Sequence, residues 1–401
     1  MARVLAILVD ALRYDLVNDK DTPFIHSLAK HGFKLPLRPI LGYSDAIRAT
    51  IFTGTYPDRH GYWMSYSYSP DTSPFKTLKC LSFIDYIPND LMRRGLKFLL
   101  SSTVMKILSR LMGYHSLHLH NIPFRIIDKF DMTTRKDFTD PDVFPGYPTI
   151  FDVLRRHGIK FAYLDSSKLK RKLLREVRNL EEDTAFTFVY LHYIDEAAHW
   201  FGMRSSKFRR SLKIVDQIAR MIVATAGEKF GDSLEIMVFS DHGMAEEQNT
   251  IDMDWMMRID GFGRDFVFSL DATMVRAWYM REDKRGELRR LISATANCRL
   301  LSDREARELG VSFDQRSYGD DIFLFDEGQI IFPNFYSYVR PRAMHAYDPA
   351  LPSQQGVFIL LCKDRSIIRT EMVELIDIGP TVLALLDIPA PSTCQGKTLL
   401  L

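Results

Sequence analysis

The chain has 401 residues, of which 46% are apolar and 26% charged, and its 53 Lys and Arg nearly balance 51 Asp and Glu for a net charge of +2. A chain this apolar can bury enough surface to fold, which excludes an intrinsically disordered protein. The near-neutral charge argues against a dedicated nucleic-acid-binding protein, which normally has a clear basic excess. We therefore expect a globular protein with no specific nucleic-acid partner.

The chain contains four cysteines, which lie far apart: Cys80, Cys298, Cys362 and Cys394. Their spacing is typical of neither a zinc finger nor a disulfide framework, and it fits a reducing compartment. The apolar run at 4–9 is too short for the core of a signal peptide. No stretch reaches the roughly 18 apolar residues that a membrane helix requires. We predict a soluble cytoplasmic protein.

Short apolar runs alternate with longer amphipathic segments along most of the chain. Near-continuous apolar strands are buried on both faces, which is typical of a largely parallel sheet covered by helices on both sides. The predicted strands are 4–9, 160–164, 185–191, 234–240 and 356–362, and the predicted helices are 22–32, 149–158, 206–227 and 372–388. The alternation predicts an α/β fold, a three-layer α/β/α sandwich.

Two stretches interrupt this alternation. Residues 65–145 are rich in Tyr, Ser, Pro and His, and residues 261–335 contain strand-like runs of their own. Because core patterning resumes after each stretch, we predict a cap-like insertion at 65–145 and a second insertion at 261–335. The catalytic core would then consist of residues 1–64, 146–260 and 336–401. Ligands of open α/β sheets bind beyond the carboxyl ends of the strands, where such insertions can form a lid.

Two further segments each allow two interpretations. The basic stretch at 155–178 fits either a patch for an anionic partner or a solvated helix face, and we favour the solvated face. The amphipathic segment at 91–114 fits either a helix lying on a membrane surface or a helix that packs the cap onto the core. Nothing else in the sequence supports peripheral membrane contact, and the oligomeric state stays open.

Residues that can bind a metal ion lie beside several predicted strands. Taken singly, each has an ordinary structural interpretation as a helix cap or turn residue. Because the carboxyl ends of parallel strands meet at one edge of a sheet, we expect these side chains to converge. Three aspartates and three histidines are the mixed oxygen and nitrogen ligands of zinc or a similar divalent ion. The six residues are Asp10, Asp195, His199, Asp241, His242 and His345.

A hydroxyl group precedes the predicted helix in GYSDAIRATIFTGTYPDRHG (42–61). Ser44 is either a helix cap or a nucleophile, because the amides at a helix N-terminus also receive anionic groups. Serine is a poor nucleophile unless a base or a metal ion activates its hydroxyl. Two metal ions about 4 Å apart could do this and hold both oxygens of an in-line phosphoryl displacement.

Together these motifs resemble the alkaline phosphatase superfamily, in particular its nucleotide pyrophosphatase/phosphodiesterase branch. The similar segments are VDALRYDL (9–16), TIFTGTYPDRHG (50–61), YIDEAAH (193–199), FSDHGM (239–244), MHAYD (344–348) and the C-terminal ELIDIGPTVLALLDIPAPSTCQGKTLL (374–400). The resemblance implies two divalent metal ions, zinc or manganese, in an enzyme that hydrolyses small phosphate esters or nucleotide-type substrates. It implies Asp195, His199 and His345 on one ion, Asp10, Asp241 and His242 on the other, and Ser44 bridging them as the nucleophile.

Arg48, four residues after Ser44, stands where sulfatases and phosphonate monoester hydrolases have an arginine. It is either a catalytic residue that grips phosphate or an arginine on the helix surface. Phosphomonoester or phosphonate hydrolysis is therefore an alternative function. A sulfatase is less expected, because the signal for oxidising its nucleophile needs proline where Ala46 stands. A metal-binding pseudoenzyme is also less expected, since all the site positions are filled.

Aromatic residues follow the predicted nucleophile and recur in and just after the second insertion, where they are suited to stack on a base or an apolar leaving group. They are Tyr62, Trp63, Tyr66, Tyr68, Trp278, Tyr279, Tyr336 and Tyr338. We predict that Tyr66 and Tyr68 contact the substrate. Arg48 favours a monoester, but the aromatic residues and the motif resemblance together favour a phosphodiester or nucleotide pyrophosphate, which we predict.

Overall fold

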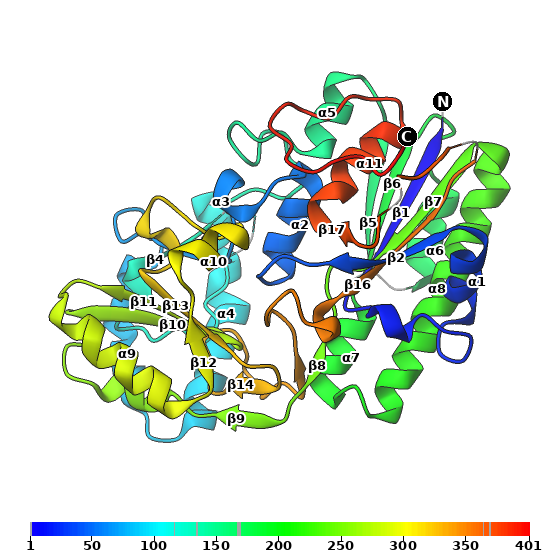
Figure 1. Cartoon of the computed structure of the whole chain (residues 1–401). Coiled ribbons are helices and arrows are strands. Elements are labelled where there is room, and N and C mark those ends of the chain that lie inside the picture. Colours follow the sequence, from blue (N-terminus) through cyan, green and yellow to red (C-terminus); the bar gives the residue numbers. More distant parts are fainter. Residues whose placement is uncertain (1, 116, 134, 167–169, 364, 369) are drawn as a thin grey trace.

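The largest sheet occupies the right-hand half of the molecule in Figure 1. Seven strands pair in it among the residues that this computed structural model describes, which are 2–115, 117–133, 135–166, 170–363, 365–368 and 370–401. In spatial order they are β17 (Val373–Glu374), β2 (Phe33–Arg38), β16 (Gly356–Leu361), β7 (Leu234–Phe239), β1 (Arg3–Val9), β6 (Phe186–Leu191) and β5 (Phe161–Asp165).

Helices cover both faces of this sheet, and β1 contributes side chains to both faces. Ala6 and Leu8 pack in one hydrophobic core, whereas Ile7 and Val9 pack in the other, as the period of two in a strand requires. The first core is covered by α2 (Ser44–Thr53), α5 (Ile150–Arg156) and α11 (Ile378–Leu385), and the second by α1 (Pro23–His31), α6 (Lys170–Arg178), α7 (Tyr193–Phe201) and α8 (Ser206–Phe230). The predicted three-layer sandwich is confirmed.

The direction of β16 decides which residues reach the functional edge of the sheet. Strands β5, β6, β1 and β7 are mutually parallel, but β16 runs antiparallel to both of its neighbours, β7 and β2. Residues that precede β16 therefore lie at the edge where β1, β6 and β7 end. Gly243, just after β7, permits the close approach, because a Cβ there would lie 2.0 Å from the carbonyl oxygen of Ser353.

The two predicted insertions form one cap, on the left in Figure 1. Side chains from both share a hydrophobic core, in which the rings of Phe130 and Trp278 lie edge to face with centroids 5.5 Å apart. The chain enters this cap at β9 (Asn249–Ile251), earlier than residue 261, because β9 pairs with β14 (Gln329–Ile331). The other cap elements are β3 (Tyr66–Tyr68), β4 (Phe130–Met132), α4 (Asp90–Met112), β10 (Phe266–Leu270), β11 (Met274–Tyr279), α9 (Asp283–Thr295), β12 (Cys298–Leu300) and β13 (Asp321–Phe325).

Short elements complete the structure between the core and the cap. Strand β8 (Ala245–Glu246) pairs with β15 (Ala343–Met344) beside the functional edge. Helix α3 (Pro57–His60) follows α2, and α10 (Asp303–Glu308) packs Ala306 against the core. None of the helices described has both the length and the apolar character needed to cross a bilayer.

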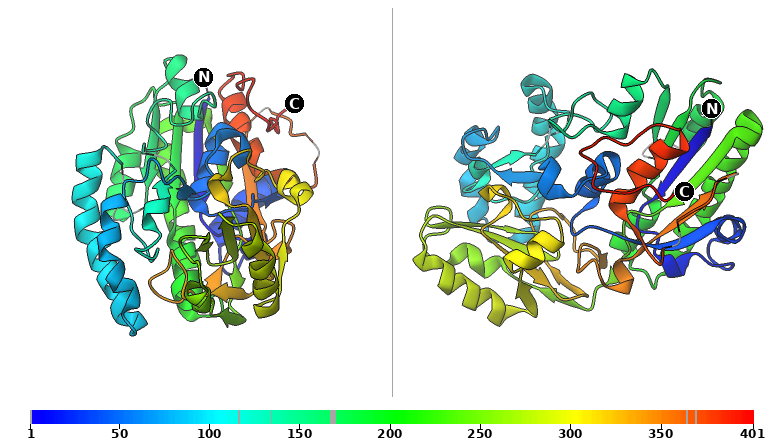
Figure 2. Two further views of the ribbon diagram at one scale, coloured as in Figure 1. Left: turned by 90° about the vertical axis from the view of Figure 1, so that its left-hand side faces the viewer. Right: turned by 45° about the horizontal axis from the view of Figure 1, so that its top comes forward.

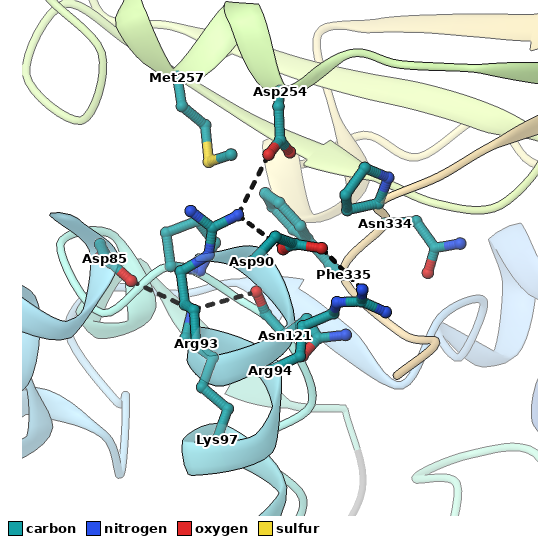
Figure 3. A pocket seen from close by; sticks show the side chains of 12 residues that line it. Asp85, Asp90, Arg93, Arg94, Lys97, Asn121, Asp254, Met257, Asn334 and Phe335 are labelled. Carbon is teal, nitrogen blue, oxygen red and sulfur yellow. Dashed lines mark hydrogen bonds and ion pairs between the residues drawn. The ribbon is translucent and has the colours of Figure 1, made fainter. Parts of the chain in front are cut away.

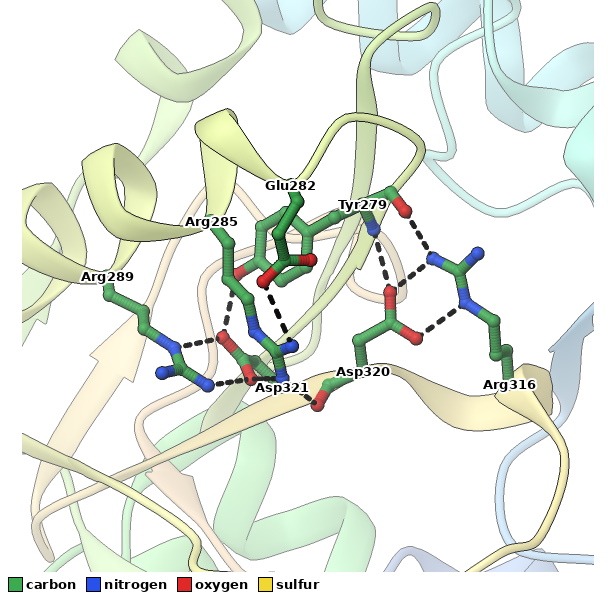
Figure 4. Close-up of polar contacts among 7 residues, drawn as sticks. All are labelled: Tyr279, Glu282, Arg285, Arg289, Arg316, Asp320 and Asp321. Carbon is green, nitrogen blue, oxygen red and sulfur yellow. Dashed lines mark hydrogen bonds and ion pairs between the residues drawn. The ribbon is translucent and has the colours of Figure 1, made fainter.

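A buried carboxylate fixes helix α9 to the cap sheet (Figure 4). Asp321 of β13 accepts hydrogen bonds from Arg285 and Arg289 of α9 and from the hydroxyl of Tyr279 on β11. Burial alone would raise the pKa of Asp321, but the two guanidinium groups hold it below its usual value. Helix α9 and the sheet therefore form one rigid unit.

The basic stretch at 155–178 is divided between two environments. Arg155, Arg156 and Lys160 form ion pairs with neighbouring carboxylates. The basic residues of α6 that follow point to solvent, as on a solvated helix face. Lys168 and the side chain of Lys170 lie outside the described residues.

His60, the last residue of α3, is buried, and its imidazole is neutral. Its Nδ1 accepts a hydrogen bond from the backbone N–H of Tyr62 at 3.2 Å, and its Nε2 lies 3.3 Å from the hydroxyl of Thr50. Burial lowers the pKa of His60 from 6.5 to about 3.

Acidification should therefore destabilise the folded protein through His60. Below pH 6.5 the unfolded chain binds a proton at His60 that the folded chain does not, so stability present above this pH is lost as the pH falls. The slope is at most about 1.4 kcal/mol per pH unit. His60→Gln should flatten the pH dependence of the urea midpoint, whereas His31→Gln, at an exposed histidine on α1, should not. Equal slopes in wild type and His60→Gln would contradict this prediction.

Candidate active site

Six polar side chains meet at the edge where β1, β6 and β7 end. Asp10 follows β1, Asp195 and His199 lie on α7 after β6, and Asp241 and His242 follow β7, while His345 follows β15. Asp10, Asp241, His242 and His345 are almost completely buried. Within the described residues, two groups have atoms close enough to hold a metal ion, namely Asp10, Asp241 and His242, and Asp195, His242 and His345.

His242 lies between the two groups. Its Nε2 is 3.2 Å from Oδ1 of Asp10 and 3.6 Å from Oδ2 of Asp241, and its ring stacks on that of His345 at a centroid distance of 3.7 Å. His199 joins the second group through Asp195, because its Nε2 lies 3.1 Å from Oδ1 of that residue. The structure thus brings all six predicted ligands together, with His242 shared where the sequence assigned it to a single ion.

Backbone carbonyl groups orient two of the histidines. Nδ1 of His199 lies 2.8 Å from the carbonyl oxygen of Ala343, and Nδ1 of His242 lies 2.7 Å from that of Gly243. A proton on each Nδ1 leaves Nε2 as the free nitrogen, and Nε2 faces the carboxylates. Metal-binding histidines are usually held in this manner.

Several buried polar atoms of the site have no hydrogen-bond partner among the described residues. Most buried polar atoms in proteins have a partner. Among the described residues, five buried side-chain atoms of this site accept or donate no hydrogen bond of normal geometry. They are Asp10 Oδ1, Asp195 Oδ1, Asp241 Oδ2, His242 Nε2 and His345 Nδ1. These unsatisfied oxygen and nitrogen atoms fit divalent metal ions.

The charges in the site favour a bound cation. Burial and the nearby charge of Asp10 raise the pKa of Asp241 to about 8. Burial lowers the pKa of His242, but Asp241 and Asp10 more than offset this and raise it to about 10. Both shifts have the same cause, because two buried carboxylates this close together are ionised only with compensating positive charge nearby.

Tyr190, near the end of β6, holds one of the carboxylates. Its hydroxyl donates a short hydrogen bond to Oδ2 of Asp10, which leaves Oδ1 directed toward His242. Sequence reasoning missed this residue, although a tyrosine at the end of a buried strand needs a partner for its hydroxyl.

Arg48 packs against aromatic side chains beside the site, and its role in gripping phosphate stays a prediction. Its guanidinium group packs on the rings of Phe138 and Tyr190, with its carbon 5.1 Å and 5.0 Å from the ring centroids, and Nη1 lies 3.4 Å from the hydroxyl of Tyr163. The side chain is turned toward the core because the face of α2 that carries it packs on the sheet. Arg48 does not line the cavity described next, and it acts on the site by helping to lower the pKa of Asp10.

Ser44 shares a cavity of about 190 Å³ with three of the candidate ligands. It is the first residue of α2, and the first turn of a helix has free backbone amides that can bind an anionic group. Asp195, His199 and His345 form the polar side of the cavity. Ser44 is therefore placed where an anionic group could bind both the helix N-terminus and the ligand cluster.

Aromatic side chains form much of the remaining cavity lining, which we call the aromatic wall. Tyr43, Trp63 and Tyr336 line the cavity, and the rings of Tyr43 and Tyr336 stack at a centroid distance of 6.2 Å. Arg276 of the cap donates to the hydroxyl of Tyr336 at 3.2 Å and forms a fully buried ion pair with Asp271 at 2.6 Å. The cap thus holds this wall rigidly against the core.

Tyr66 and Tyr68, which we predict to contact the substrate, lie outside the lining of this cavity. Tyr66 is 1% exposed and its hydroxyl donates to the carbonyl oxygen of His118, so it packs behind Tyr336. Tyr68 stacks on Trp278 at a centroid distance of 5.5 Å. Neither lines the cavity, because strand β3 that carries them is part of the cap interior.

The chain combines an α/β/α sandwich with candidate metal ligands clustered at one edge of its main sheet. Residues 4–306 match the type I phosphodiesterase/nucleotide pyrophosphatase family, and the chain belongs to this family. It is a phosphoric ester hydrolase, in a family that typically depends on divalent metal ions.

Solved structures share the fold over nearly the whole chain. Murine ectonucleotide pyrophosphatase/phosphodiesterase 5 is 16% identical, with a TM-score of 0.69 over 97% of this chain and 96% of that chain. An inactive variant of the murine protein in complex with AMP matches with 16% identity and a TM-score of 0.69 over 98% and 96%. The human protein is 16% identical, with a TM-score of 0.70 over 99% of both chains.

Removing the Tyr190 hydroxyl should weaken metal binding. Tyr190→Phe frees Oδ2 of Asp10 from its hydrogen bond, and loss of such a supporting contact typically lowers metal affinity by about 10–100-fold. Competition with a chromophoric chelator measures the affinity directly. Tyr114→Phe is the matched control, because Tyr114 donates to Asp131 at 2.9 Å in the cap. Equal affinities in both variants and wild type would contradict the role of Tyr190.

Proposed function

We propose that the protein hydrolyses phosphodiesters or nucleotide pyrophosphates, with Ser44 as the nucleophile. The observation that carries this proposal is the mixed lining of one cavity, in which Ser44 and three candidate ligands lie together with aromatic side chains. The polar groups suit a phosphoryl group, and the aromatic groups suit the apolar or base-containing substituent that distinguishes a diester from a monoester.

In this reaction Ser44 forms the new bond to phosphorus, and backbone amides bind the phosphoryl group. The hydroxyl of Ser44 passes its proton to water as its oxygen bonds to phosphorus, and the leaving oxygen departs and takes up a proton from water. A water molecule then attacks phosphorus, breaks its bond to the serine oxygen and releases the phosphate product, and the serine oxygen is protonated again. The amides of the first turn of α2 bind a phosphoryl oxygen. Divalent ions bound at the two ligand groups would act as Lewis acids that favour the ionised hydroxyl and stabilise charge on the phosphoryl oxygens.

We propose zinc as the metal, with two ions per chain. The nitrogen and oxygen ligands suit zinc, and manganese is the alternative that accepts the same carboxylate-rich set. The chelator titration described above also counts the ions, and one ion or none per chain would contradict the proposal. The four cysteines are free thiols, which supports the proposed cytoplasmic location.

The nucleophile assignment has a direct test. Ser44→Ala should lower kcat by at least about 10³-fold while the protein folds and binds metal normally, because the covalent path is removed. Ser206→Ala, at the first residue of α8, makes the same change at the same helical position and should keep full activity. A phospho-serine peptide at Ser44 in quenched reactions would support the mechanism directly. Near-normal turnover by Ser44→Ala would instead show that water attacks without a covalent intermediate.

Substrate preference tests the aromatic wall. We expect kcat/KM to be higher for bis-p-nitrophenyl phosphate or a dinucleotide than for p-nitrophenyl phosphate. Tyr336→Ala should lower kcat/KM for the dinucleotide by about 10-fold or more, because stacking on a base contributes about 1–3 kcal/mol. Tyr68→Ala, away from the cavity, should leave the preference unchanged. Preference for the monoester would favour the alternative phosphomonoesterase or phosphonate hydrolase.

A further inference from the structure

Helix α4 presents an apolar surface to solvent along its whole length. It stands at the left edge of the left-hand view in Figure 2. Leu91, Phe98, Leu99, Ile107 and Leu111 are between 53% and 77% exposed. The outward stripe of α4 and its C-terminal cap consists of Leu91, Met92, Gly95, Phe98, Leu99, Thr103, Lys106, Ile107, Arg110, Leu111, Met112 and Gly113.

The orientation of α4 is fixed by polar contacts on its inner side (Figure 3). Arg93 forms ion pairs with Asp90 and with Asp254 of the cap, at 2.8 Å and 3.1 Å. Lys97 is 3% exposed and forms an ion pair with Asp85 at 3.1 Å. Rotating the helix to bury its outward stripe would break the buried pair of Lys97 and Asp85, which is strongly unfavourable. The contacts on the inner side of α4 therefore keep its apolar stripe facing solvent.

A second long helix shows that this surface is unusual within the same protein. Helix α8 also lies at the surface, and Ile214, at 38%, is the large apolar residue among its exposed positions. The other exposed positions of α8 are Ser206, Lys207, Arg209, Arg210, Lys213, Gln217, Arg220, Ala224 and Glu228. A contiguous apolar patch on a protein surface usually marks an interaction site, so the outer face of α4 is suited to a covering partner.

The charges on the stripe indicate what covers it. Lys106 and Arg110 are its charged residues, and neither forms an ion pair with another described residue. Pairing with a second copy of this chain would place the same surface on both sides and bring together cations without any acid. The complementary surface is apolar and anionic, as an acidic lipid bilayer is.

We propose that the outward stripe of α4 binds the surface of an anionic lipid bilayer. The helix lies in the plane of the interface, with Phe98, Leu99 and Ile107 among the acyl chains. Lys106 and Arg110 extend along the surface to the phosphate groups. Phe83 and Tyr86, which are 65% and 71% exposed just before α4, add aromatic residues suited to the interface. This proposal does not depend on which phosphate ester the enzyme hydrolyses.

Co-sedimentation with vesicles tests the proposal. Wild-type protein should bind vesicles of phosphatidylcholine mixed with phosphatidylserine, bind phosphatidylcholine alone more weakly, and lose affinity for the mixed vesicles as salt rises. The double variant Phe98→Glu, Leu99→Glu should bind the mixed vesicles at least about 10-fold more weakly. Lys106→Ala and Arg110→Ala should each weaken binding about fivefold. Ile214→Glu on α8 is the matched control and should bind normally, and circular dichroism and urea midpoints report whether each variant folds.

Three results would overturn the proposal. The first is wild-type protein that does not bind the mixed vesicles, or binds them as well as the folded double variant does. The second is a concentration-dependent dimer in sedimentation equilibrium that the double variant abolishes, which would identify a second copy as the partner. The third is vesicle binding that is lost in Tyr336→Ala and kept in the double variant, which would place the lipid in the catalytic cavity.

Discussion

The structure depends on the burial of several carboxylates at one edge of its main sheet. Asp10 and Asp241 are 1% and 0% exposed and both approach His242. Two unit charges 4 Å apart repel by about 4 kcal/mol at the effective dielectric typical of proteins. Such a cluster is stable only with compensating positive charge, which the divalent ions that we propose would supply. The reversed strand β16 and the close approach at Gly243 bring His345 to this cluster. The topology of the sheet therefore determines which side chains surround the buried carboxylates.

The core and the cap contribute different parts of the cavity lining. Ser44 and the ligands Asp195, His199 and His345 lie on core elements, whereas Tyr336 is positioned by Arg276 and Asp271 of the cap. Substitutions in the cap can therefore reshape the aromatic wall without displacing the ligands.

The parts of the site that follow strands could be predicted from the sequence, and the parts that depend on packing between distant segments could not. Asp10, Asp241 and His242 each end a strand whose apolar pattern is plain, so their convergence follows from the parallel sheet. Tyr66 and Tyr68 lie outside the cavity lining because strand β3 packs on a second segment more than 60 residues away, at β4. The hydrophobic periodicity of a strand does not indicate which distant strand pairs with it. The sharing of His242 between two ligand groups is likewise a property of three-dimensional distances alone.

The outer surface of α4 and the inner surface of the cavity are joined by one short segment. Arg94 donates to the carbonyl oxygen of Tyr338, and the ring of Phe98 packs edge to face on that of Tyr338 at a centroid distance of 5.3 Å. Tyr336 and Ser337, the two residues before it, line the cavity. A bilayer covering α4 would thus lie against the same segment that shapes the aromatic wall. Because packed interiors transmit small displacements, the surface that covers α4 and the substituent that fits the cavity act on the same few residues.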